Sequence, residues 1–95
     1  MVYLELLRQG WEIYIGKIDS YEIDFVAQQG GLRKYFQVAL SVRDEATLER
    51  EMRSLRAVKD NYQKLLLTMD DDPPADDNGI HRINVLDWLA KGGNV

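Results

Sequence analysis

The chain has 95 residues, enough for one domain and too few for two. Its 45% hydrophobic and 29% charged residues argue against disorder, and the absence of cysteine excludes disulfides, a thiolate zinc site and a cysteine nucleophile. The net charge of −4 argues against a generally basic nucleic-acid binder. We expect one cytoplasmic domain over residues 1–95 without membrane contact, since no apolar run is long enough to span a bilayer.

The first predicted element is a helix over residues 1–9, ended by Gly10 as a left-handed stop. Its polar side chains share one face, and the other faces are covered by Leu4, Leu6 and Leu7. A nine-residue helix is marginal in isolation, so we expect this one to dock on a sheet. No capping residue precedes it, which leads us to expect a domain boundary here and further protein upstream.

Three strands are predicted next, at residues 11–18, 21–28 and 34–42. The first two alternate branched or aromatic residues with polar ones, and the turn at 19–20 makes them a hairpin. The pair Gly30-Gly31 gives a second turn before the third strand. The sequence therefore predicts an antiparallel meander.

The second half predicts a helix over 44–59, a buried strand over 63–69, a short strand over 80–85 and a terminal helical turn over 86–91. A strand that follows a helical crossover is expected to be parallel to its neighbour. The segment 70–79 is acidic and holds two prolines, so we expect an exposed loop. The predicted fold is α/β, with a mixed sheet of about five strands flanked by helices in the order αβββαββα.

Three residues are candidates for chemistry: Glu5 on the first helix, Asp24 on the second strand and Gln37 on the third. Each of them also has a possible structural role that involves no chemistry. Glu5 can pair with Arg8 on a solvated helix face. Asp24 can be a surface residue, although Asp is disfavoured in strands, and Gln37, set between apolar neighbours, can be an interior hydrogen-bonding residue.

The chain resembles the C-terminal domain of uncharacterised AAA-superfamily ATPases along essentially its whole length. The segments that carry the resemblance are residues 2–10, 22–26, 35–39, 49–51, 59–62 and 87–89. That domain belongs to the restriction-endonuclease-like PD-(D/E)xK group, named for an Asp on one strand and Glu-x-Lys on the next. Residues two apart on a strand share a face, so in that group the second carboxylate and the Lys both face a metal held by the Asp.

The resemblance implies that Asp24 matches the motif Asp, Glu5 the helix Glu that often joins the site, and Gln37 the second carboxylate. Ala39 stands where the motif has Lys. An amide oxygen ligates Mg²⁺ only weakly, and Ala39 offers neither charge nor hydrogen-bond donor. If Mg²⁺ binds, its expected ligands are thus Asp24, Gln37 and Glu5.

Hydrolysis by this site would require a replacement for the missing lysine, and the candidates are Lys17 and Lys34. We therefore expect a degenerate nuclease-like domain with a binding or regulatory role. Two alternatives stay open, an active Mg²⁺-dependent DNA endonuclease and a purely structural or oligomerisation domain. The resemblance implies that the partner is an N-terminal ATPase module of a larger protein, with DNA and a second copy of the chain as further candidates. No Gly-rich phosphate loop is present, so nucleotide hydrolysis is expected to lie outside this chain.

Overall fold

The computed structural model of this chain describes residues 2–18 and 21–92, and the turn predicted at 19–20 lies outside them. The first element, α1 (Val2–Arg8), ends as the sequence predicts, because Gly10 adopts a φ of 87° that residues with a side chain rarely tolerate. The chain then turns into the sheet.

The meander predicted from the sequence is present. β1 (Glu12–Ile18) pairs antiparallel with β2 (Tyr21–Gln29), which pairs antiparallel with β3 (Leu32–Ala39). The third strand was expected at 34–42, but it begins earlier and ends at Ala39. It ends there because the chain leaves the sheet to reach the following helix, and the backbone N–H of Val42 bonds to a side chain instead of a strand.

The crossover after β3 also follows the prediction. α2 (Glu45–Arg56) is capped by Asp44, whose carboxylate accepts from the backbone N–H of Thr47 at 3.0 Å. β4 (Gln63–Thr68) then lies parallel to β3. The sheet is therefore mixed, as a helical crossover between neighbouring strands requires.

The segment 70–79 is not simply an exposed loop, because it contains the short strand β5 (Ala75–Asp77). β5 pairs antiparallel with β6 (Ile80–Asn84), and the two-residue turn between them is Asn78-Gly79, with φ values of 53° and 86°. Positive φ at both central residues is the requirement of a tight hairpin turn, and Asn-Gly meets it. The prolines lie before the strand, and β5 is at the sheet edge, so neither costs a ladder bond.

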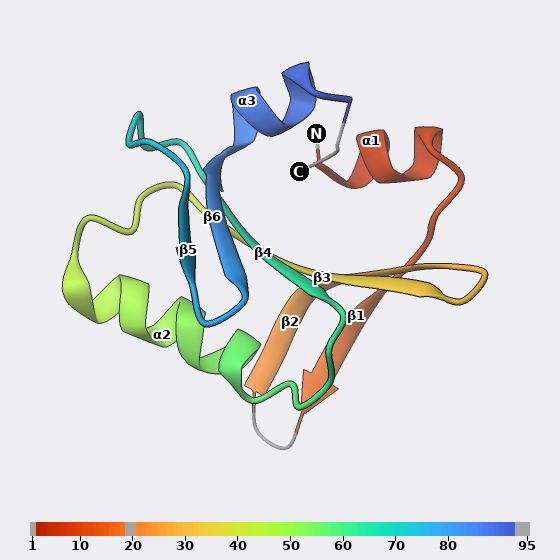
Figure 1. Ribbon diagram of the computed structural model, residues 1–95, viewed down its shortest axis with the longest axis horizontal. Helices are drawn as coiled ribbons and strands as arrows, with labels where there is room; N and C mark the ends of the chain where they lie inside the picture. Colours follow the sequence, from red (N-terminus) through yellow and green to blue (C-terminus); the bar gives the residue numbers. More distant parts are fainter. Residues whose placement is uncertain (1, 19–20, 93–95) are drawn as a thin grey trace.

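In the described residues, the six strands form one sheet in the order β1-β2-β3-β4-β6-β5, so the element order is αβββαβββα. The last helix, α3 (Val85–Ala90), is capped by Asn84, which accepts from two backbone N–H groups. Figure 1 shows α1 and α3 on one side of the sheet and α2 on the other. Among the described helices, none is long and apolar enough to cross a membrane.

Each side of the sheet has its own apolar core. On the α1 and α3 side, Phe36 and Trp88 are fully buried and meet edge to face, with ring centroids 5.6 Å apart. On the other side, α2 packs through Leu48, Met52 and Leu55, the stripe set by helical periodicity. The sheet is thus covered on both faces, which accounts for its continuous apolar β4.

The apolar side chains of α1 are the main departure from the predicted packing. Val2 and Leu6 are buried, whereas Leu4 is 67% exposed and Leu7 45% exposed. A helix of seven residues contacts the sheet along one narrow line, so leucines on its other sides stay outside the core. α1 therefore presents an apolar outer surface.

Candidate functional site

Asp24 and Gln37 lie together where the β2–β3 ladder ends. The ladder pairs Phe25 with Phe36, and the next residues along the two strands are Asp24 and Gln37. The backbone N–H of Asp24 donates to Gln37 Oε1 at 2.7 Å, and the backbone N–H of Val38 donates to Asp24 Oδ2 at 2.9 Å. Each side chain thus supplies an acceptor to the opposite strand, and the two side chains act as a clamp between β2 and β3.

A β-bulge sets the position of Asp24. Between the pairs Tyr14–Val26 and Gly16–Ile23, β1 has one residue and β2 has two, Asp24 and Phe25. The extra residue bends the strand and redirects side chains. Ile23 and Val26 consequently both join the core beneath α2 although they are three residues apart.

A third polar residue, Glu51 of α2, joins this pair. Gln37 is 3% exposed, and its Nε2 donates to Glu51 Oε2 at 3.0 Å. Burial raises the pKa of Glu51 above its usual value, and the Asp24 carboxylate raises it further, whereas Arg50 lowers it. Asp24, Gln37 and Glu51 form what we call the polar clamp.

Sequence reasoning missed Glu51, although a signal was present. Glu51 follows Leu48 by three residues and precedes Leu55 by four, so helical periodicity places it on the sheet-facing side of α2. An acidic residue there must meet a polar partner of the sheet. Gln37, the one buried polar residue of β3, is that partner.

The polar clamp opens into a pocket of about 410 Å³ between α2 and the end of β2. The charged residues of its lining are of both signs. The lining residues are Tyr21, Glu22, Asp24, Gln37, Arg50, Glu51, Arg53 and Ser54. The basic side chains of α2 therefore face carboxylates in this pocket. A uniformly positive surface, which phosphate binding favours, is not built here.

Glu5 is not joined to the clamp. Its carboxylate accepts from Arg8 Nε at 3.1 Å and from Gln9 Nε2 at 2.7 Å, and the hydrogen bond from Arg8 lowers its pKa. Gln9 also donates to the backbone oxygen of Gly92, which links α1 to the chain that follows α3. Among the described residues, no hydrogen bond or ion pair connects Glu5 with Asp24 or Gln37. The pairing with Arg8 is the one considered from the sequence, but the side chain of Glu5 is only 14% exposed.

Ala39, where the resemblance would place a lysine, has no cation of β3 beside it. Ala39 packs partly buried against the core beneath α2. The ammonium of Lys34 lies 5.3 Å from the centroid of the Trp11 ring, in the core on the α1 and α3 side, which is the opposite face from Gln37. Lys17 lies on edge strand β1, opposite Glu22 in the β1–β2 ladder.

These positions do not fit a firmly held Mg²⁺ ion. The Oε1 of Gln37 and the Oδ2 of Asp24 both accept backbone N–H groups, which leaves few free oxygens for a cation that prefers six. Across residues 2–18 and 21–92, no three His, Cys, Asp or Glu side chains gather closely enough to share a metal.

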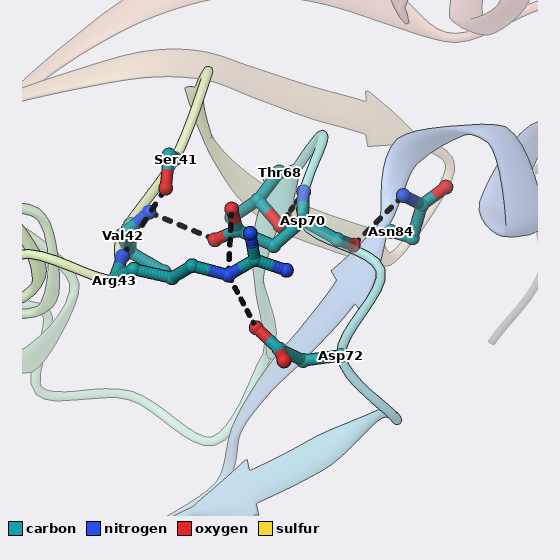
Figure 2. Close-up of polar contacts among 7 residues, drawn as sticks. All are labelled: Ser41, Val42, Arg43, Thr68, Asp70, Asp72 and Asn84. Carbon is teal, nitrogen blue, oxygen red and sulfur yellow. Dashed lines mark hydrogen bonds and ion pairs between the residues drawn. The ribbon is translucent and has the colours of Figure 1, made fainter.

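A second polar cluster, shown in Figure 2, closes the carboxyl ends of β4 and β6. The sequence predicted that segment 70–79 is exposed throughout, but Asp70 is buried, 7% exposed. Its Oδ2 accepts from the backbone N–H of Val42 at 2.9 Å, and its backbone oxygen accepts from Asn84 Nδ2 at 2.8 Å. Arg43 stands 3.6 Å from its Oδ1. Asp70 is thus a structural link between the start of α2 and two strand ends.

Comparison with known proteins adds one relative and no family model. The chain is 39% identical over 91 residues to an uncharacterized protein of Haemophilus influenzae (strain ATCC 51907 / DSM 11121 / KW20 / Rd). The matched region covers 96% of this chain but 22% of that protein. The chain therefore spans about a fifth of the length of this relative, and no family model matches it.

Proposed function

We propose that this chain is a restriction-endonuclease-like module of a larger AAA-type ATPase that has lost nuclease chemistry and serves in binding or regulation. The observation that carries the proposal is the clamp between Asp24 and Gln37, whose oxygens bond to the backbone of the opposite strand. Residues at the positions of the motif carboxylates thus stabilise the sheet. The motif lysine is replaced by Ala39, which cannot orient an attacking water.

The link to a larger protein is supported by the relative, in which the matched region is 22% of the length. This chain has no Gly-rich phosphate loop, so nucleotide hydrolysis would be performed elsewhere in such a protein. With a net charge of −4 and carboxylates in its polar pocket, the domain would repel DNA phosphates more than attract them. A protein partner is accordingly favoured over DNA.

One observation favours a second candidate, the Mg²⁺-dependent endonuclease. Glu51 brings a carboxylate from α2 beside Gln37 and close enough to Asp24 to raise its own pKa. Two carboxylates would then face one pocket, and Mg²⁺, if it bound there, would supply a Lewis acid and an activated water. The first proposal and this one differ in a measurable activity.

The test is a plasmid-nicking assay in Mg²⁺ and in Mn²⁺ with the natural chain and Asp24→Ala. We expect no nicking above the buffer control by either protein. Metal-dependent nicking by the natural chain that Asp24→Ala abolishes would overturn the proposal and establish the second candidate. The double variant Gln37→Glu with Ala39→Lys restores the motif, and nicking by that variant alone would support a nuclease scaffold whose chemistry has been lost.

A further inference from the structure

A groove of about 530 Å³ lies on the α1 and α3 side of the sheet, where β3 and β4 end. α1 forms one wall through Val2 and Tyr3, and the first residue of α3, Val85, contributes to it. The rest of the lining comes from β2 and from the ends of β3 and β4, and includes Leu40 and Met69. We call this surface the apolar groove.

Three side chains of the apolar groove are strongly exposed, whereas Val2 and Val85, which also line it, belong to the core. Leu40 is 84% exposed, and Tyr3 and Met69 are each 45% exposed. Elsewhere on α1, Leu4 is 67% exposed and Leu7 is 45% exposed. Single exposed apolar residues are ordinary, but a contiguous hollow lined by them marks an interaction surface.

Asp24 is the charged residue in the lining of the apolar groove, and every other lining residue is apolar or aromatic. Its Oδ2 accepts from the backbone N–H of Val38, and its Oδ1 has no hydrogen bond or ion pair with the described residues. A segment that fills the groove would therefore present apolar side chains together with one Lys or Arg. The basic group would gain a charge-assisted hydrogen bond.

We propose that the apolar groove is the docking site for another segment of the longer polypeptide that contains this chain, a segment with apolar side chains and a basic residue facing Asp24. This proposal rests on the proposed function in one respect, that the chain is a module of a larger protein. The relative has about four fifths of its length outside the matched region. A segment joined to the amino end of α1 would start beside the groove, since Val2 lines it.

A second copy of this chain is a poorer occupant. Pairing two apolar grooves face to face would bring two Asp24 carboxylates together, and each copy already has a net charge of −4. Like charges brought together in an interface oppose association. A segment of the same polypeptide meets no such repulsion when it carries a basic residue, and its effective concentration is on the order of mM.

The test places the photoreactive residue p-benzoylphenylalanine at position 40 in the full natural polypeptide, with position 32 as the matched control. Leu32 is also strongly exposed, 62%, but it is the first residue of β3, at the opposite end of that strand from Leu40, and it does not line the groove. After irradiation, mass spectrometry identifies the partner peptide. We expect position 40, and not position 32, to cross-link to a segment of the same polypeptide outside residues 1–95, with a yield unchanged on roughly hundredfold dilution, as intramolecular reactions require.

Cross-links from position 40 to a second copy, to another protein or only within residues 1–95 would overturn the proposal, as would a natural polypeptide with no chain beyond these residues. The change Asp24→Asn keeps an acceptor for Val38 and removes the charge, so it should lower the cross-link yield. An unchanged yield would show that the docked segment has no basic residue facing Asp24. Neither result depends on plasmid nicking. Failure of the docking proposal can therefore be told apart from failure of the proposal that nuclease chemistry has been lost.

Discussion

Gln37 of β3 and Glu51 of α2 are joined by a hydrogen bond of 3.0 Å, from Gln37 Nε2 to Glu51 Oε2. The bond ties the helix to the sheet beside the bulge that holds Asp24. A carboxylate so placed is partly desolvated and stands near another negative charge. The charged form of Glu51 is therefore disfavoured relative to its neutral form.

The first prediction concerns this residue. Because the pKa of Glu51 is raised in the folded chain, its stability contribution is greatest below the unfolded pKa and is lost as pH rises through the folded pKa. Glu51→Gln stays uncharged and can still accept from Gln37. We expect Glu51→Gln to have a higher melting temperature than the natural chain at pH 7, with the difference disappearing near pH 4, as measured by circular dichroism. A variant that is less stable at pH 7 would show that the charged form is favoured.

The second prediction concerns Asp70, whose pKa is shifted in the opposite direction from that of Glu51. The backbone N–H of Val42 holds the pKa of Asp70 below its usual value. Its stabilising contribution is present above the unfolded pKa, about 3.9, and is lost as pH falls through the folded pKa. We expect the natural chain to lose more stability than Asp70→Asn between pH 6 and pH 3 in urea titrations. Asp71→Asn, which removes an exposed charge from the same loop, is the control, and equal pH profiles for all three proteins would contradict the assignment.

Gly16 supplies a prediction about the bulge. A Cβ at this position would stand 2.5 Å from Val26 Cγ2 and 3.2 Å from Ile23 Cβ, inside a β-branched core. We expect Gly16→Ala to lower the free energy of unfolding by about 1–3 kcal/mol, the usual cost of overpacking. Gly31→Ala is the matched control, because nothing lies within 4 Å of its added Cβ. Equal urea midpoints for the two variants would show that β1 shifts at the bulge to accommodate the added methyl group without loss of stability.

Much of the fold could be predicted from local pattern. Gly10, Asp44 and the stripe of Leu48, Met52 and Leu55 act through their own segments, so periodicity and capping chemistry identify them. β5 was missed because the prolines of the acidic segment outweighed the Asn78-Gly79 hairpin signal. The burial of Asp70 could not be predicted, because its partner Val42 is 28 residues away and is brought near only by the parallel strands.

Part of the candidate site could also be predicted from local pattern. Asp24 and Gln37 come from consecutive strands of a meander, so pairing alone brings them together. Glu5 was expected to join them, but its nearest charge, Arg8, is on its own helix at i+3 and is always within reach. Glu51 comes from a helix on the far side of a crossover, and its contact depends on how that helix lies over the sheet.

The most direct test of the structural role of the polar clamp is a Mn²⁺ titration of the ¹⁵N-labelled chain followed by NMR. The amides of Asp24 and Val38 donate to Gln37 and Asp24, so they are the best-placed reporters of any ion bound there. We predict that Mn²⁺ broadens these two signals no more than amides elsewhere in the sheet, in the natural chain and in Glu51→Gln alike. Selective broadening of the Asp24 and Val38 amides by Mn²⁺ that is lost in Glu51→Gln would contradict the account and establish a metal site.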